Sequence, residues 1–270
     1  MSHVHVLRIF AGRPLTPRPD PNRIGGLEWT QRTKGRLTRS ERLQLLAATV
    51  NGQRDFFLHR LRRDRPSATP RPVDRDIRPP DSRFAREVEA AAAEQNPVLI
   101  THGYRSWIFG RALAAVDGSK VDEELLFAGT LLHDHGIESI VSGEDFTLRS
   151  AQRATECAHA AGLDDIRTLT LADAITVHTT PGITIERDGA LGYYIQNGAL
   201  VDIAGNRIWD LSQSLIDDTL ARYDRKGFTR GLGGCFTAEA KAVPGGRFSM
   251  LRRCGFVGLM HIAPFDKESK

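Results

Sequence analysis

The segment from Asp122 to His133 constrains the fold more than any other part of the chain. Its spacing predicts a helix, and its leucine, alanine and glycine residues leave little polar surface on any side. A helix that is apolar nearly all round belongs at the centre of a protein core. The run His133-Asp134-His135 ends this helix, so groups that bind metals or transfer protons are predicted to emerge from a buried position. A simple C-terminal cap with a local ion pair is the alternative interpretation of His133-Asp134.

Helix-forming segments flank this central one. Asp81 or Ser82 can cap a helix that runs through residues 87–94, and Asn96-Pro97 ends it. Between residues 183 and 187 the alternating pattern predicts a short strand or a loop, and the glycine-rich tail predicts irregular structure before a last helix over residues 248–260. The chain is therefore predicted to be all-α. The other predicted helices cover residues 98–115, 150–161, 165–179, 193–203 and 211–223.

The first 80 residues differ from the rest in composition. They hold nine of the 13 prolines and 17 of the 37 Lys and Arg residues, but only seven of the 33 acidic residues. Such proline density excludes helix and central strand, so we expect extended segments around one helix that begins at Ser40-Glu41. That helix could dock through a face formed by Leu43, Leu46, Val50, Phe57 and Leu61. The predicted division is a basic Pro/Arg-rich extension, 1–80, and a domain, 81–270.

Composition excludes several classes of protein. With 40% hydrophobic and 26% charged residues, the chain of 270 residues is typical of globular proteins. No run approaches the roughly 20 apolar residues of a membrane span, and the first ten residues lack a secretory signal pattern, so a cytoplasmic protein without a membrane partner is expected. The three cysteines show no C-x-x-C spacing, which argues against a disulfide scaffold or a thiolate zinc site. Nucleic-acid binding is not favoured, because the basic extension lacks a recognised motif.

Four side chains far apart in the sequence could converge on one site. His102, His133, Asp134 and Asp202 offer the nitrogen and oxygen ligands that zinc, iron or manganese accept. Such an ion lowers the pKa of a water molecule that it binds, which makes hydroxide available near neutral pH. Asp173 is a rival for the role of Asp202. Weaker candidates for ligands or proton donors are His135 and His159.

The order His, His-Asp, Asp on predicted helices resembles the HD-domain metal-dependent hydrolases. The likeness extends over residues 97–110, 131–134 and 174–183, where the sequence is similar to the cyanamide hydratase-like branch of that superfamily. Members of this branch add water to a nitrile carbon at one zinc ion. The resemblance covers residues 81 to about 265 and implies an HD-domain helical bundle with one divalent ion, zinc first and Fe²⁺ or Mn²⁺ as alternatives.

The resemblance also implies roles for single residues. His102, His133, Asp134 and Asp202 would be the metal ligands. Arg105 would fix a carboxylate ligand or meet an anionic group of the substrate, and His178, which opens a His-Thr-Thr-Pro-Gly turn, would transfer a proton or support a ligand.

One position departs from the hydratase-like pattern. Where that pattern carries an acidic pair after the His-Asp helix, this chain has Thr147 and Arg149. If these residues line the pocket, they favour an anionic substrate over cyanamide. We accordingly expect catalysis by Asp134, His178, Arg105 and Arg149, with either arginine holding developing negative charge.

Four functions stay open at this point. The first is addition of water to, or hydrolysis of, a small polar substrate at one ion. The second is hydrolysis of a nucleotide or phosphomonoester, with Arg105, Arg149 and Arg153 neutralising phosphate. A third is a dinuclear phosphodiesterase or oxygenase that uses His159 and His178 as further ligands. The fourth is a non-catalytic module that binds through the basic extension. The expected partner is a small molecule, and a homo-oligomer is possible.

Overall fold

The computed structural model describes residues 20, 22–62, 64–71 and 77–266. Within these residues every regular element is a helix, apart from two isolated β-bridges. The all-α prediction is therefore confirmed for the described part of the chain. The longer helices are α2 (Arg39–Arg62), α3 (Arg83–Ala92), α4 (Pro97–Val116), α5 (Glu123–Leu132), α6 (Phe146–Ala161), α7 (Asp165–Val177), α9 (Ala190–Ala204), α10 (Gln213–Arg222) and α11 (Phe228–Ala242). The shorter ones are α1 (Leu27–Thr33), α8 (Ile185–Asp188), α12 (Arg247–Arg253) and α13 (Phe256–Met260), with 3₁₀ turns at His135–Ile137, Ile208–Asp210 and Pro264–Asp266.

Helix α5 lies at the centre of the bundle, as predicted. The Asp122 carboxylate caps it by accepting hydrogen bonds from the backbone N–H groups of Glu124 and Leu125, and the last eight residues of the helix are all buried. Helices α3, α4, α6, α7 and α9 pack around it. Because the surrounding helices exclude water from every side of α5, its C-terminal end opens into the interior of the protein.

Helices α4 and α9 form the most extensive contact in the fold, and glycines set its spacing. A Cβ atom on Gly110 would lie 2.7 Å from the Tyr194 carbonyl oxygen, and one on Gly198 would lie 2.1 Å from the Ser106 carbonyl oxygen. The two helices are thus antiparallel and approach backbone to backbone. One turn beyond the contact of Ser106 with Gly198, the same register places His102 opposite Asp202.

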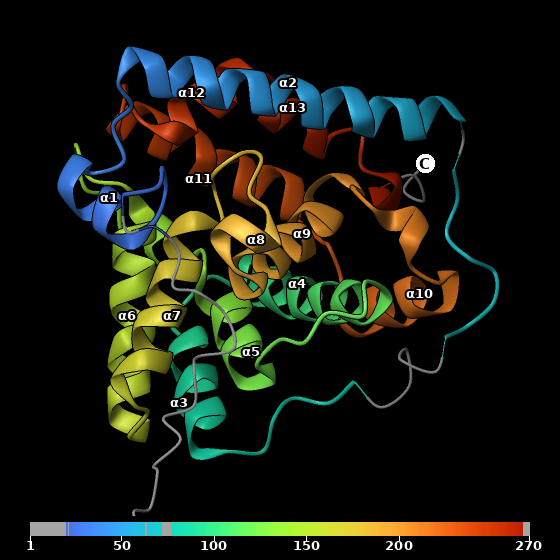
Figure 1. Cartoon of the computed structure of the whole chain (residues 1–270). Helices are drawn as coiled ribbons and strands as arrows, with labels where there is room; N and C mark the ends of the chain where they lie inside the picture. Colours follow the sequence, from blue (N-terminus) through green and yellow to red (C-terminus); the bar gives the residue numbers. More distant parts are fainter. Residues whose placement is uncertain (1–19, 21, 63, 72–76, 267–270) are drawn as a thin grey trace, which may run out of the picture.

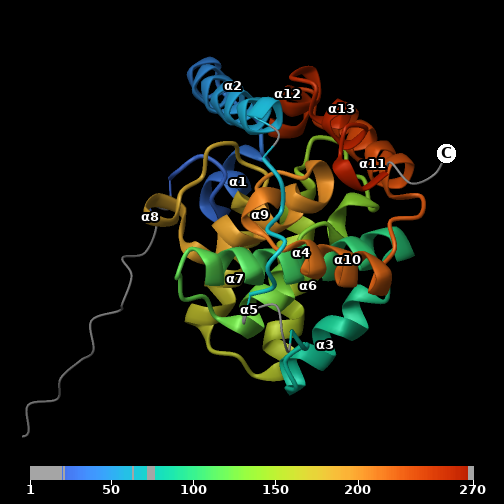
Figure 2. The same cartoon turned by 90° about the vertical axis from the view of Figure 1, so that its right-hand side faces the viewer.

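A second layer covers one end of this bundle. Helix α2 lies beside α12 and α13, and together with α11 these helices form the upper layer in Figures 1 and 2. Gln53 of α2 donates a 2.8 Å hydrogen bond to the Cys254 carbonyl oxygen, at the junction between α12 and α13. This upper layer therefore joins residues near the two ends of the described chain.

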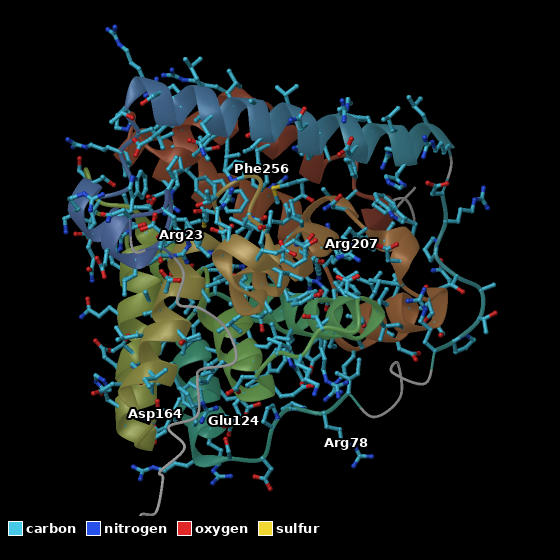
Figure 3. All side chains as sticks on the ribbon, viewed as in Figure 1. Arg23, Arg78, Glu124, Asp164, Arg207 and Phe256 are labelled. Atoms are coloured by element: carbon cyan, nitrogen blue, oxygen red, sulfur yellow. The ribbon has the colours of Figure 1, made fainter. Side chains whose placement is uncertain are left out.

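Several described residues among the first 80 contact the bundle closely. Arg23, labelled in Figure 3, is buried and forms ion pairs with Asp173 and Asp188. Asp173, the rival candidate for a metal ligand, is thus engaged with Arg23 and with the Leu27 N–H group. The predicted proline-rich segments are non-helical over residues 64–71 and 77–82, and those of residues 1–19 and 72–76 lie outside the described residues. The division at residue 80 stays a prediction.

The prediction of which face of α2 docks on the rest of the protein is wrong. Leu43, Val50 and Leu61 are 69%, 54% and 79% exposed, and Leu46 and Phe57 are exposed as well. The helix instead buries Leu45, Thr49 and Phe56. The error arises because α2 carries apolar residues on two faces, and the larger stripe in the sequence is the one turned to solvent.

Three other segments differ from their predictions. The segment 183–187, predicted as a short strand or a loop, instead leads into the short helix α8, which Thr184 caps. The glycine-rich tail contains the unpredicted helix α11, whose Phe228, Leu232 and Phe236 are buried. The single helix expected over residues 248–260 is divided at Gly255, which has a φ of +83°.

The remaining predictions concern helix starts, cysteines and membranes. Helix α6 begins at Phe146, four residues before the predicted start, because Asp145 caps it. All three cysteines are free thiols. In the described residues, no helix combines the length and hydropathy needed to span a bilayer.

Candidate metal centre

His133 and Asp134 stand where α5 ends, and His102 of α4 faces them. The His133 Nε2 atom lies 3.3 Å from His102 Nε2 and 3.3 Å from Asp134 Oδ2. The third pair, His102 Nε2 and Asp134 Oδ2, is 3.8 Å apart. All three residues are buried, with at most 4% of their surface exposed. The structure therefore brings together two residues from adjacent positions and a third from 31 residues earlier.

Three histidines share one protonation pattern around this cluster. His133 Nδ1 lies 2.7 Å from the Thr130 carbonyl oxygen, and His178 Nδ1 lies 2.6 Å from the Ile175 carbonyl oxygen. Since a carbonyl only accepts, each Nδ1 must carry the proton and donate it. His102 Nδ1 likewise donates to Asp202 Oδ2 over 2.6 Å. In the neutral rings each Nε2 atom is then an unprotonated ligand atom.

His178 reaches the cluster from α7. It ends that helix as His133 ends α5, and its ring stacks edge-on against the His133 ring with centroids 4.9 Å apart. Its Nε2 atom is 3.7 Å from Asp134 Oδ1, while the other oxygen of Asp134 faces His102 and His133. Asp134 thus lies between the His102–His133 pair and His178.

The structure places Asp202 at the other ring nitrogen of His102. Its carboxylate meets Arg105 through two hydrogen bonds of 2.8 Å, from Nε to Oδ1 and from Nη2 to Oδ2, and it also contacts Arg225. Arg105 further donates to the Asp224 carbonyl oxygen over 2.6 Å. Asp202 is fully buried but has a charge-assisted partner at each oxygen. It orients the His102 ring and lies outside the group of mutually close ligand atoms.

The pKa values of the site residues follow from their burial and from these charged hydrogen-bond partners. Burial would raise the pKa of Asp134 and of Asp202, but His133 beside the first and Arg105 with Arg225 beside the second hold both pKa values well below their usual range. Burial lowers the pKa of His102 and of His178, whereas the adjacent Asp134 outweighs burial and raises the pKa of His133. The two carboxylates are therefore ionised at neutral pH, and the His178 ring is neutral.

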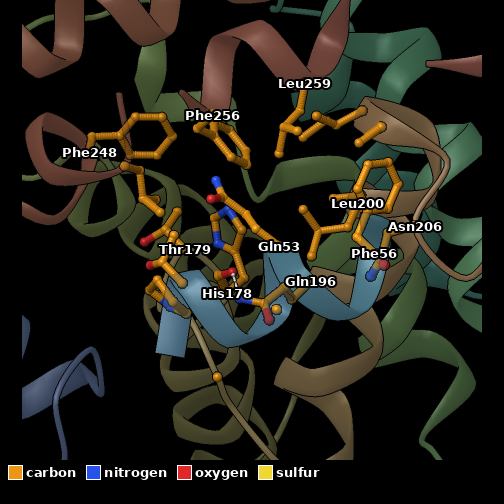
Figure 4. A pocket seen from close by; sticks show the side chains of 18 of the residues that line it. Gln53, Phe56, His178, Thr179, Gln196, Leu200, Asn206, Phe248, Phe256 and Leu259 are labelled. Atoms are coloured by element: carbon orange, nitrogen blue, oxygen red, sulfur yellow. Dashed lines mark hydrogen bonds between the residues drawn. The ribbon is translucent and has the colours of Figure 1, made fainter. Parts of the chain in front are cut away.

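A cavity of about 220 Å³ opens beside this cluster (Figure 4). His133, Asp134 and His178 line it, whereas His102 does not. The rest of the wall is mostly apolar and comes from α2, α9, α11, α12 and α13. A molecule in the cavity can therefore reach one side of the cluster, while the surrounding helices close the other side.

Several predicted site residues lie elsewhere. Arg105 and Arg149 do not line the cavity, and Arg149 donates to the Gly136 carbonyl oxygen at 3.2 and 3.3 Å. The Thr147 hydroxyl donates a 2.7 Å hydrogen bond to the Asp145 carboxylate. Thr147 also lies outside the cavity wall. The expectation that Thr147 and Arg149 line the pocket is therefore wrong. Arg153 is paired with Glu94.

The two weaker histidine candidates are also outside the cluster. His135 Nε2 lies 3.2 Å from Glu94 Oε2, and His159 is exposed on α6. Sequence reasoning in turn missed Thr179, which follows His178 and lines the cavity. Its signal in the sequence is its place in the His-Thr-Thr-Pro-Gly turn, directly after His178.

The donor set fits a divalent transition metal. His102, His133 and Asp134 each offer one ligand atom, and these atoms all lie within 4.8 Å of one another. Ligands held about 2.0–2.1 Å from a tetrahedral zinc ion are roughly 3.3 Å apart, which is the spacing of two of the three pairs. Each histidine has an acceptor at Nδ1, as metal-binding histidines usually do. The cavity leaves room for a water molecule or substrate as a further ligand.

Two comparisons with known proteins identified no relative of this chain. The chain matches no protein-family model, and a search of curated proteins found no match.

Proposed function

We propose that this chain is an HD-domain metal-dependent enzyme that adds water to, or hydrolyses, a small substrate, in the manner of the cyanamide hydratase-like branch. The observation that carries the proposal is the buried His102–His133–Asp134 cluster at the wall of a cavity. One divalent ion is proposed, with zinc first and Fe²⁺ or Mn²⁺ as alternatives. When bound, the ion would supply Lewis acidity for water and for an electrophilic carbon.

The side chains around the cluster supply the proton transfers. Water forms a bond from its oxygen to the electrophilic carbon, and one of its protons passes to Nε2 of His178. His178 suits this role because its Nδ1 proton is held by the Ile175 carbonyl and its ring is neutral. It then delivers the proton to the nitrogen or the leaving group of the substrate. Asp134, which stays ionised with Oδ1 3.7 Å from His178 Nε2, stabilises the imidazolium that forms when His178 takes up the proton.

The geometry favours this function over the two other enzymatic candidates. Arg105, Arg149 and Arg153, the residues expected to neutralise a phosphate, all bind protein groups and lie outside the cavity wall. A second metal ion would need His159, which is exposed on α6. A single ion and a substrate without phosphate fit the described residues better. The binding-module candidate gains no support from any described feature of residues 20–71.

The test is elemental analysis of the purified protein after zinc loading, on the wild type and on matched variants. We expect one ion per chain in the wild type and none in His133→Ala or Asp134→Ala, because each removes a ligand. Asp202→Ala should retain binding but weaken it about 10- to 100-fold, as expected for a residue that orients a ligand. His135→Ala is the control, since it changes the neighbouring histidine, which pairs with Glu94.

Turnover of nitriles, amides and phosphomonoesters by the zinc-loaded protein then separates the candidates. Hydration or hydrolysis of a neutral substrate, lost in Asp134→Ala, supports the proposal. Zinc binding that is unchanged in both ligand variants would contradict it, and so would two ions per chain that fall to one in His159→Ala.

A further inference from the structure

The cavity beside the cluster has an aromatic and aliphatic wall. Phe56 comes from α2, Phe236 from α11, Phe248 from α12 and Phe256 from α13, and Figure 4 shows the rings of Phe56, Phe248 and Phe256 around the space next to His178. Leucine, isoleucine and alanine side chains extend this apolar surface, and Thr49, Gln53, Gln196 and Asn206 add uncharged polar groups to the wall. An apolar cavity of roughly 150 Å³ is enough to hold benzene. The cavity of about 220 Å³ therefore has room for one ring and a compact head group.

Charge in the wall is confined to the cluster end. Among the described residues that line the cavity, the ionisable ones are His133, Asp134 and His178, and no lysine or arginine is present. An anion buried against an apolar wall without a cation or several donors is strongly disfavoured. The cavity thus selects against phosphate or carboxylate on the body of a ligand, and it favours a neutral apolar body with its polar end at the cluster.

One hydroxyl in this wall has no partner. Thr179 is 8% exposed, and its Oγ1 atom forms no hydrogen bond with the described residues. Its neighbour Thr180 is different, because Oγ1 of Thr180 accepts a 2.9 Å hydrogen bond from Arg247. A buried hydroxyl without a partner is costly unless a ligand supplies one. Thr179 lies beside His178 at the cavity, where it would meet the polar end of a bound molecule (Figure 4).

We propose that the cavity binds a neutral molecule with an apolar body the size of a single ring, and that the Thr179 hydroxyl forms a hydrogen bond with its polar head beside His178. This inference rests on the proposed function for the identity of the reacting head. The apolar body would occupy the space among the four phenylalanines. Thr179 is then a substrate-binding residue that also sets the direction in which the head faces the cluster.

The test compares two hydroxamic acids that share one metal-binding head and differ only in the body. Benzohydroxamate carries a phenyl ring and acetohydroxamate a methyl group. Binding to zinc-loaded wild-type protein is measured by isothermal titration calorimetry. Burial of the ring should favour benzohydroxamate by about 30-fold or more. 4-Carboxybenzohydroxamate, which carries an anion on the ring, should bind at least about tenfold more weakly than benzohydroxamate. Equal affinity for benzohydroxamate and acetohydroxamate, or tighter binding of the ring carboxylate, would overturn the inference.

The role of Thr179 is tested with a conservative pair of substitutions. Thr179→Val keeps the shape and removes the hydroxyl, so benzohydroxamate should bind about 3- to 10-fold more weakly. Thr179→Ser retains the hydroxyl and should restore most of that loss. Thr170→Val is the control, because Thr170 lies on the exposed surface of α7 and bonds only to the Ile166 carbonyl oxygen. Unchanged affinity in Thr179→Val would remove Thr179 from the site.

Zinc content distinguishes failure of this inference from failure of the proposed function. If zinc does not bind at His102, His133 and Asp134, the proposed function fails, whatever the hydroxamates do. If zinc binds and benzohydroxamate and acetohydroxamate bind equally, only the substrate class fails. All variants are compared by circular dichroism and thermal unfolding, so that a misfolded protein is recognised before its affinity is interpreted.

Discussion

The bundle around α5 and the layer formed by α2 and α11–α13 meet at the cavity but are built differently. In the bundle, the groups at the site are ionic and fully enclosed: Asp202 has Arg105, Arg225 and His102 as partners. In the upper layer, the groups at the cavity are mostly apolar, and a hydrogen bond from Gln53 to the Cys254 carbonyl oxygen ties α2 to the junction of α12 and α13. In the proposed function, the ionic groups of the bundle would carry the chemistry and the apolar groups of the upper layer would bind the substrate.

This difference predicts how each part responds to mutation. A buried ion network is sensitive because loss of one partner leaves another charge unpaired in a low dielectric. An apolar wall tolerates exchange of side chains of similar volume, since dispersion contacts are numerous and individually weak. The bundle should therefore permit few substitutions, whereas the upper layer should accept changes in the cavity wall without loss of the proposed metal site.

The largest expected effect breaks the ion network of the bundle. Arg105→Met leaves the buried Asp202 with fewer cationic partners, so the free energy of unfolding should fall by about 3–5 kcal/mol. Urea denaturation measures this loss. Arg86→Ala is the control, because Arg86 pairs with Asp81 on the surface and should change stability by less than about 0.5 kcal/mol. A similar small loss in both variants would show that the network around Asp202 is not what distinguishes the bundle.

A second effect concerns the seam between the two parts. Glu239 of α11 is buried beside Asp145, which caps α6, and burial together with that carboxylate raises the pKa of Glu239 to about 7. The folded protein therefore holds this proton more tightly than the unfolded chain, where the ordinary value is 4.5. The resulting stabilisation is present below the unfolded pKa and is lost as the pH rises through about 7.

Glu239→Gln should remove this pH dependence. Relative to wild type, the variant should gain on the order of 2 kcal/mol between pH 5 and pH 8, because an amide carries no charge to bury. Urea denaturation at both pH values gives the difference. Glu186→Gln, an exposed exchange of the same chemistry, should leave the pH dependence unchanged. If wild type and Glu239→Gln show parallel stability profiles, Glu239 does not titrate at the seam.

The smallest effect falls on the upper layer. Gln53→Ala removes the hydrogen bond to the Cys254 carbonyl oxygen and should lower the free energy of unfolding by about 1 kcal/mol. Zinc content should stay at the wild-type value, because Gln53 touches none of the three proposed ligands. Chemical denaturation and elemental analysis of the same preparation check both statements. A loss of zinc would show that the layer and the metal site are coupled after all.

Local patterns in the sequence predicted the helices better than their faces. Asp122 and Ser82 mark the starts of α5 and α3 because a cap acts within one turn. The burial of α5 followed from its composition alone. For α2, composition favoured the wrong stripe, since two faces carry apolar residues and only contact with α12 and the cavity selects Leu45 and Phe56. Helix α11 was missed because its glycines conceal the Phe228–Leu232–Phe236 spacing.

The candidate site likewise contains residues that the sequence could identify and residues whose positions it could not predict. His102, His133, Asp134 and His178 could be named from the sequence, and the structure gathers them. The places of Arg149 and Thr147 could not, because the packing of α6 against α3, α5 and α7 decides whether any of its faces meets the cavity.

By itself, the sequence determined that the chain is helical, where most helices begin and end, and that His133 and Asp134 follow a buried helix. Only the tertiary structure decided that Asp202 meets Nδ1 of His102, that Arg105 binds Asp202, and that the cavity wall is apolar. The physical reason is the range of the interactions. Caps and periodicity act over a few residues, whereas the contact of α4 with α9 depends on Gly110 and Gly198 meeting a distant backbone.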